Sequence, residues 1–334
     1  MQWKTQIKEL WTRASWSGTA AFTLPGVLFE IQPDFVLAAR LAGRSNDNGH
    51  AQVGHVAWEP LEPGTLAASP GGPAVLNSPS LAGALAKTAA LVGNGQNRTG
   101  LLLPDGVARV GVFPLESLPE NRREAATVLG WKMRETLPFP PEEARLTYQI
   151  ARVPGATVSA EASLEVIVVA VRSSVLVEFE RLIEGINRSS AMILPATMAL
   201  LPLLASDIAG GQFLLHVYSS TATYAVVERQ RLRFWRSRDF AGLDLDEFFV
   251  QVVAEAGRVV ASTEDRLSLP LERIWLCTRP PATDAWAGQL AAVLGRQVER
   301  LETAPEASGL LAREDRALFR RYGVTLAGLA ANHQ

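Results

Sequence analysis

The chain has 334 residues, of which 48% are hydrophobic and 20% are charged, and its formal net charge is −2. This composition is typical of a globular protein and excludes a disordered chain. A net charge near zero gives no indication of nucleic-acid binding, and the single cysteine, Cys277, excludes an internal disulfide.

Two further observations predict a cytoplasmic protein without a metal site. No run of eighteen apolar residues occurs, so we expect no membrane-spanning helix, and charged residues interrupt the N-terminal segment, which is therefore not a secretory signal. Of the four histidines, His50 and His55 are neighbours on a loop-rich stretch, but none shows metal-ligand spacing.

Residues 1–20 are predicted to form an amphipathic helix. Trp3, Ile7, Leu10 and Trp11 fall on one face, while basic residues lie mostly off it. A short basic helix with tryptophan on its apolar face can lie in a membrane interface. The alternative is that this face packs on the protein itself or on a partner.

The first half of the chain opens with three short strands, at 27–31, 35–41 and 52–58. After a Pro-, Gly- and Ser-rich loop at 60–79, the pattern predicts a helix at 81–92 and a buried strand at 99–103. An insertion-like block follows, with a strand at 107–113, a helix at 122–136 and a strand at 146–152. The half ends with a buried strand at 165–171, an amphipathic helix at 174–186, a strand at 191–194 and a helix at 197–205.

The second half repeats this order. Strands are predicted at 213–218, 223–228 and 232–236, followed by a helix at 245–262, a strand at 273–277, a helix at 282–294, a strand at 297–301 and a helix at 313–330. Three consecutive strands followed by helix–strand alternation predict an α/β fold of the duplicated actin-like (ribonuclease H-like) type, with two lobes and mixed five-stranded sheets flanked by helices. We expect a first lobe at 21–205 with a small subdomain inserted at about 101–170, a second lobe at 206–303, and a C-terminal helix at 304–334 that returns to the first lobe.

A helix broken by prolines carries the clearest family resemblance. The motifs are LLPD at 102–105, RVGVFPLESLP at 109–119 and WKMRETLPFP at 131–140, followed by a strand. Together they resemble the PilM family, actin-like cytoplasmic proteins of the type IV pilus assembly machinery. Similar blocks occur in the cytoplasmic domains of GspL-type type II secretion proteins.

The resemblance implies a function in protein–protein interaction. It implies a position at the cytoplasmic side of the inner membrane and a partner, the short cytoplasmic tail of a PilN-like membrane protein. In the family this tail lies in a groove beside the inserted subdomain, which Leu137, Pro138, Phe139 and Pro140 would rim or support. Rigid proline and phenylalanine surfaces suit the capture of an extended segment.

The loops that bind ATP in related proteins depart from the family pattern here. In the first half, Glu30, Gln32 and Asp34 occupy the place of an Asp-Ile-Gly-type loop, and Pro33 offers no N–H. In the second half, His216 replaces the expected aspartate and Tyr218 the expected glycine, and the third loop, LCTRPP at 276–281, has prolines instead of glycines.

We therefore predict a pseudo-ATPase, not an enzyme, with no cofactor. The alternative is an ATP- and Mg²⁺-binding protein whose lobes close on the nucleotide, in which Glu30 supplies a carboxylate and Ser219, Ser220 and Thr221 donate to phosphate. These hydroxyl groups also suit an exposed hairpin turn. A sugar kinase is disfavoured, because no catalytic aspartate lies in a glycine-rich setting.

Two charged patterns remain. Asp244, Asp246 and Glu247 are expected at a helix start, where the helix dipole favours acidic residues, more than in a catalytic carboxylate pair. Alternating arginines along a predicted hairpin form either a solvated strand face or a surface for the acidic segment of a partner. They are Arg229, Arg231, Arg233, Arg236 and Arg238.

Overall fold

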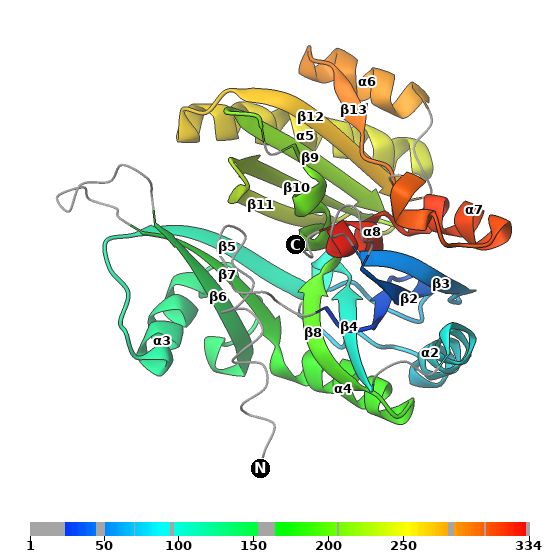
Figure 1. Cartoon of the computed structure of the whole chain (residues 1–334). Coiled ribbons are helices and arrows are strands. Elements are labelled where there is room, and N and C mark those ends of the chain that lie inside the picture. Colours follow the sequence, from blue (N-terminus) through cyan, green and yellow to red (C-terminus); the bar gives the residue numbers. More distant parts are fainter. Residues whose placement is uncertain are drawn as a thin grey trace.

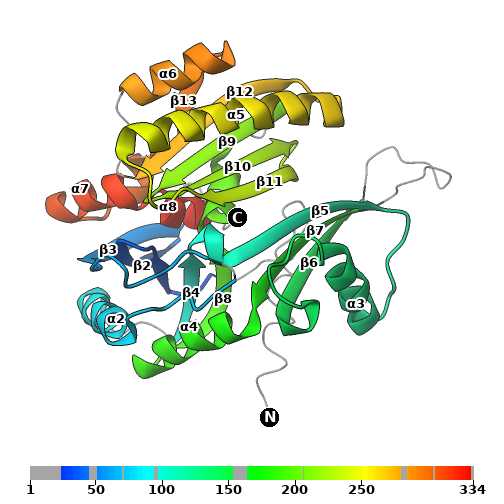
Figure 2. The same cartoon turned by 180° about the vertical axis from the view of Figure 1, so that it is seen from behind.

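The computed structural model describes residues 24–44, 51–69, 71–93, 97–152, 164–205, 207–279, 284–303 and 305–331. These residues form two lobes, each built on a five-stranded sheet, and a smaller three-stranded sheet that extends from the first lobe (Figures 1 and 2). The predicted N-terminal helix with Trp3, Ile7, Leu10 and Trp11 lies outside the described residues, as does the loop at 46–49.

The first lobe has the strand order β3-β2-β1-β4-β8. Strands β1 to β3 are antiparallel neighbours, whereas β4 and β8 continue the sheet in parallel. All five residues of β1 are buried, as expected for a central strand covered on both faces. The elements are β1 (Val27–Ile31), β2 (Phe35–Arg44), β3 (Ala51–Pro60), α2 (Ser78–Val92), β4 (Arg98–Leu103), η1 (Asp105–Val107), α4 (Ser173–Gly185), β8 (Ser189–Pro195) and η3 (Ala196–Leu203).

The second lobe repeats this topology with the order β11-β10-β9-β12-β13, in which β9 to β11 are antiparallel and β12 and β13 continue in parallel. The duplicated fold predicted from the sequence is therefore confirmed. Asp244 begins α5 by accepting a hydrogen bond from Glu247 N at 2.8 Å, as expected for acidic residues at a helix start. The elements are β9 (Gly211–Tyr218), β10 (Thr221–Glu228), β11 (Arg231–Asp239), α5 (Leu245–Leu267), β12 (Leu271–Arg279), α6 (Asp284–Leu294) and β13 (Val298–Arg300).

The inserted part is an antiparallel sheet of order β5-β7-β6 with one helix on its outer face (Figure 1). Alternate residues of its strands face two different cores. Val166, Val168 and Ala170 pack with α3, while Ile167 and Val169 join the core of the first lobe. The elements are β5 (Ala108–Leu115), α3 (Arg122–Met133), η2 (Pro141–Glu143), β6 (Ala144–Arg152) and β7 (Leu164–Arg172).

Two helices differ from the prediction. The expected helix at 313–330 is divided at Gly323 into α7 (Arg313–Tyr322) and α8 (Val324–Ala331). The Phe319 ring packs so closely against Gly323 that a side chain there would clash, which explains the glycine at this position. The expected α-helix at 197–205 is the 3₁₀ helix η3, which contains Pro202. The chain between β13 and α7 forms η4 (Pro305–Ser308).

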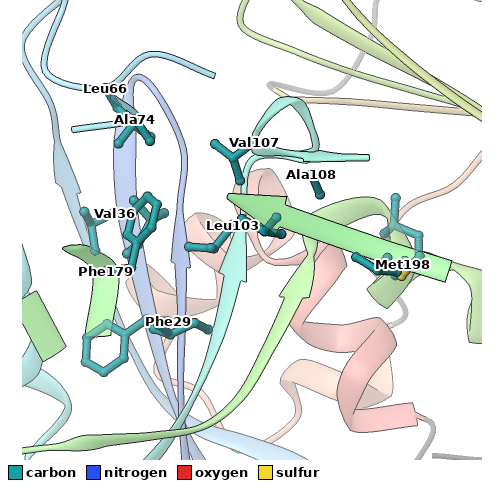
Figure 3. Packing of buried hydrophobic residues seen from close by; sticks show 14 of the residues in the cluster. Phe29, Val36, Leu66, Ala74, Leu103, Val107, Ala108, Phe179 and Met198 are labelled. Atoms are coloured by element: carbon teal, nitrogen blue, oxygen red, sulfur yellow. The ribbon is translucent and has the colours of Figure 1, made fainter. Parts of the chain in front are cut away.

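The main hydrophobic core continues from the first lobe into the second. In the first lobe, Phe29 on β1 and Phe179 on α4 lie on the same side of the sheet, with Leu103 and Val107 nearby (Figure 3). The same cluster includes Leu214 and Ala225 of the second sheet, as well as other second-lobe residues. One face of the second sheet is therefore buried against the first lobe, whereas α5 and α6 cover its other face (Figure 2). None of the helices in the described residues is long and apolar enough to cross a membrane.

Candidate functional site

The loops that correspond to the predicted nucleotide loops meet at the interface of the two lobes. Glu30 lies near the end of β1, Asp105 follows β4, His216 lies on β9 and Arg279 ends β12. In each lobe these strands are parallel neighbours at the centre of the sheet, and ligands of α/β sheets bind at the carboxyl ends of such strands. All four side chains are buried, so their charges and hydrogen bonds depend on one another.

An ion pair between Arg279 and Glu30 is one half of this buried cluster. Arg279 Nη1 contacts Glu30 Oε1, and both side chains are almost completely inaccessible to solvent. Glu30 also accepts hydrogen bonds from Gln32 Nε2, at 2.8 Å, and from Thr325 Oγ1 on α8. Arg279 further donates to the carbonyl oxygen of Tyr322 at 3.2 Å. Burial, the largest single effect, would lower the pKa of Arg279, but the Glu30 carboxylate together with Cys277 and Tyr218 outweighs burial and raises the pKa, so the guanidinium remains charged.

A chain of hydrogen bonds from His216 to Asp105 is the other half. Arg279 Nη2 lies 3.3 Å from His216 Nε2, and a guanidinium has no acceptor, so this ring nitrogen accepts. His216 Nδ1 therefore carries the proton and donates to Thr197 Oγ1 at 2.5 Å. Thr197 Oγ1 in turn donates to Asp105 Oδ2, which also accepts from Thr223 Oγ1 at 2.7 Å. The hydrogen bonds thus assign the neutral tautomer of His216.

The buried environment shifts the pKa values of the groups in this second half of the buried cluster. Burial, and secondarily the positive charge of Arg279, holds the pKa of His216 well below its usual range. Burial raises the pKa of Asp105, although hydrogen bonds from Thr197 and Thr223 oppose the shift. Burial, together with the Asp105 carboxyl group, raises the pKa of Tyr218, whose hydroxyl oxygen accepts from Asp105 N at 2.7 Å.

Most of these contacts join one lobe to the other. Asp105 and Thr197 belong to the first lobe, whereas their partners Thr223 and His216 belong to the second. The pair of Arg279 and Glu30 crosses the same interface. The polar side chains buried between the lobes therefore bind one another and hold the lobes together.

The predicted nucleotide-loop residues occupy different places. Glu30, Gln32 and His216 belong to the buried cluster, but the Asp34 side chain is exposed at the β1–β2 turn. Ser219 adopts the left-handed backbone conformation in the β9–β10 turn, with φ of 48°. The hydroxyl groups of Ser220 and Thr221 differ in whether they form a hydrogen bond.

Ser220 Oγ donates to Asp239 Oδ1 at 2.7 Å, whereas Thr221 Oγ1 is buried and has no hydrogen-bond partner. Sequence reasoning missed Asp105, Thr197, Thr223 and the pairing of Arg279. The LLPD motif at 102–105 was the one available signal for Asp105, because a carboxylate directly after a buried strand lies at the edge where ligands bind.

A groove lies between the inserted sheet and the first lobe. It separates β6, an edge strand of the inserted sheet, from β8, an edge strand of the first sheet. Its empty space, including the part open to solvent, is about 680 Å³, and its exposed surface is mainly apolar. The groove is lined by Leu103, Val107, Ala108, Arg145, Leu146, Thr147, Val169, Val171, Leu176, Ser190, Met192, Ile193, Leu194 and Pro195.

The proline turn, residues 137–140, does not rim this groove. Leu137 and Phe139 are buried with Leu129 and Met133 of α3 in the core on the opposite face of the inserted sheet, while Pro138 and Pro140 are exposed. The turn therefore supports the groove from behind the strands and does not contact its space. A role of Leu137 to Pro140 in partner binding stays a prediction.

Neither a protein-family model nor a curated protein matches the sequence. The structure is similar to that of a PilM–PilN type IV pilus biogenesis complex, with a TM-score of 0.75, 16% sequence identity, and coverage of 92% of this chain and 98% of that chain. It is less similar to the cytoplasmic domain of EpsL, an inner-membrane component of the type II secretion system of Vibrio cholerae, with a TM-score of 0.47, 10% identity, and coverage of 89% and 96%. The expected likeness to PilM holds for the whole fold.

Proposed function

We propose that this protein is a cytoplasmic scaffold of a type IV pilus or type II secretion-like assembly platform at the inner membrane. The fold shared with the chain in the PilM–PilN complex, over nearly the full length of both chains, carries this proposal. The partner is the cytoplasmic tail of a PilN-like membrane protein. Contact of the segment at 1–20 with the membrane or with a partner protein, through Trp3, Ile7, Leu10 and Trp11, belongs to the same proposal.

The groove between β6 and β8 suits an extended tail. Both strands are sheet edges, whose unpaired backbone groups can bind an additional strand, and the apolar lining can receive alternate side chains of that strand. Leu137 and Phe139 stabilise the sheet that forms one wall. Binding to the groove itself, and not to the proline turn, is therefore the sharper form of the proposal.

Replacing Ile193 by glutamate tests this assignment. Ile193 is a half-buried residue of the groove lining, and a carboxylate there would face the apolar side chains of the tail. We expect Ile193→Glu to weaken binding of the synthetic tail peptide by about tenfold or more, which corresponds to roughly 1.4 kcal/mol. Isothermal titration measures the dissociation constant.

A matched control uses the same substitution outside the groove. Ile150 on β6 is 45% exposed and is not part of the lining, so Ile150→Glu should leave the affinity unchanged. Tail binding to Ile193→Glu with the affinity of the unmodified protein would exclude the groove as the binding site. Equal losses in both variants would indicate a general effect of the added carboxylate and not the loss of a contact in the groove.

The second part of the proposal is that the protein does not use ATP. The groups that would face phosphates and Mg²⁺ are paired with one another, notably Glu30 with Arg279 and Asp105 with Thr197. Two buried atoms in the cluster, Gln32 Oε1 and Arg279 Nε, have no hydrogen-bond partner, and they favour the alternative that a ligand enters the cleft.

Titration calorimetry with Mg-ATP separates the two possibilities. We expect no heat of binding, because a nucleotide would have to break the buried ion pair and the hydrogen bonds between the lobes. The Ile193→Glu variant serves as a second sample with an unchanged cleft. Micromolar binding of Mg-ATP to both proteins would establish the nucleotide-binding alternative.

A further inference from the structure

The arginines of β11 divide into two groups with different partners. Arg231 and Arg233 contact Glu228, at 3.9 and 2.7 Å, and Arg233 also contacts Glu165 of the inserted sheet at 3.1 Å. Two positive charges here meet two carboxylates. This end of the strand is therefore electrically balanced, and its arginines fix β11 to neighbouring strands.

The other group is not balanced. Arg236 and Arg238 of β11, together with Arg258 of α5, contact the carboxylate of Glu255, which is 3% exposed, and these arginines form no other ion pair within the described part of the chain. Three positive charges and one negative charge leave a net charge of +2. The side chains of these three arginines are 52%, 44% and 61% exposed to solvent, whereas that of Glu255 is buried. We call these three arginines the arginine cluster.

The arginine cluster is held in place by its surroundings. Arg236 contacts Glu255 Oε1 at 3.2 Å, whereas Arg238 contacts Oε2 at 3.3 Å. Arg258 donates to the same Oε2 from Nε, at 3.0 Å, and from Nη2, at 2.5 Å. The guanidinium of Arg238 also lies 5.1 Å from the centre of the Phe240 ring. A fixed guanidinium loses less conformational entropy when it binds a carboxylate than a freely rotating one does.

Exposed apolar residues lie on α5 near the arginine cluster, and the carboxylates Asp246 and Glu247 are exposed at the start of the same helix. Arg258 lies on the exposed side of α5, which packs beside β11 (Figure 2), and Val250 is exposed two turns earlier on the same helix face. Eight helical residues span about 12 Å, the reach of three or four extended residues. Leu245, at the start of α5, is also exposed. One short extended segment of a partner is therefore long enough to contact both the arginine cluster and the exposed apolar residues of α5.

We infer that the arginine cluster and the exposed side of α5 bind an acidic segment of a protein partner. That segment carries at least two neighbouring carboxylates and an apolar residue a few positions away. Guanidinium groups bind carboxylates through paired hydrogen bonds, and the net charge of +2 attracts such a segment before contact. The apolar neighbours favour a peptide over inorganic phosphate, which could use only the charges. This surface lies on the second lobe and does not depend on the groove proposed for the tail.

The test removes two positive charges and leaves Glu255 paired. In Arg236→Gln/Arg238→Gln, Arg258 keeps both of its hydrogen bonds to Glu255, so the buried carboxylate retains a counter-charge. The matched control, Arg320→Gln/Arg321→Gln, removes two charges from exposed residues of α7. The probe is a fluorescent synthetic peptide with a run of glutamates followed by leucines, measured by anisotropy at low and at physiological salt.

We expect the cluster variant to bind this peptide about tenfold more weakly than the unmodified protein and the control variant do. A version of the peptide with lysines in place of glutamates should not bind. Equal affinity of the two variants, or no binding to the unmodified protein, would overturn the inference. Binding of inorganic phosphate or of phosphatidylglycerol vesicles through the cluster, without peptide binding, would overturn it in favour of a phosphate ligand. Thermal unfolding followed by circular dichroism checks that both variants are folded.

Discussion

Replacing Arg279 by glutamine should lower the free energy of unfolding by about 3–5 kcal/mol, the cost of leaving one partner of a buried ion pair without its counter-charge. Arg279 and Glu30 are almost completely buried, so water cannot compensate the carboxylate that remains. Gln32 and Thr325 would still donate to Glu30, but both are neutral. Urea denaturation followed by circular dichroism measures the change.

A control on the same strand separates burial from charge. Arg273 on β12 pairs with Glu299 at 3.5 Å, and both side chains are substantially exposed. Arg273→Gln should therefore change the unfolding free energy by no more than about 1 kcal/mol. If Arg279→Gln were as stable as this control, the buried pair would not hold the lobes together.

A second substitution tests whether the cost of Arg279→Gln arises from the orphaned charge. In Glu30→Gln/Arg279→Gln neither charge of the pair remains, so the double variant should be more stable than the sum of the two single changes predicts. The coupling energy of this cycle reports the interaction directly. Strict additivity would mean that each side chain contributes through packing alone.

The fold could be predicted because its signals are local. The antiparallel openings of both halves appear as three strands separated by turns, and the central strands β1 and β9 are apolar runs. The division of the last helix at Gly323 could not be predicted, because the helical pattern of the sequence continues across this glycine. A glycine inside a helical pattern is otherwise tolerated.

The site could be predicted only in part. The departure of Glu30 and His216 from the expected nucleotide-loop residues is visible in the sequence, but the pairing of Glu30 with Arg279 depends on how the lobes meet. The packing of the proline turn could likewise not be predicted from the sequence. Its composition suggests a rigid surface, yet Leu137 and Phe139 face the core of the inserted sheet, and only the packing of α3 decides this. Long-range contacts, and not local propensity, determine which polar groups meet.

Lowering the pH should destabilise the protein through His216. The folded-state pKa of His216 is well below the usual value of about 6.5, which applies to the unfolded chain. Between these two values the unfolded chain binds a proton that the folded protein does not. The contribution of His216 is therefore fully present above about pH 6.5. Below that pH it is lost at about 1.4 kcal/mol per pH unit, until the folded-state pKa is reached.

The hydrogen bonds explain why protonation is so unfavourable. His216 Nε2 accepts from Arg279, and a proton there would place two donors and two positive charges against each other. Nδ1 already donates to Thr197, so protonation gains no new partner on that side. The lost stability should therefore appear as separation of the lobes, because Arg279 contacts Glu30 and His216 contacts Thr197 across the same interface.

Comparison with His216→Gln isolates this contribution. Glutamine keeps an oxygen and an N–H for the two neighbours but does not titrate in this range. Asp105 also titrates: its raised pKa means that its contribution is lost as the pH rises, the opposite sign, so the pH dependence of the unmodified protein alone is a sum of opposing effects. The difference between the two proteins, from urea denaturation at a series of pH values from 7.5 to about 5, should grow by about 1.4 kcal/mol per unit below pH 6.5. A constant difference would show that His216 is not held neutral by burial and by Arg279.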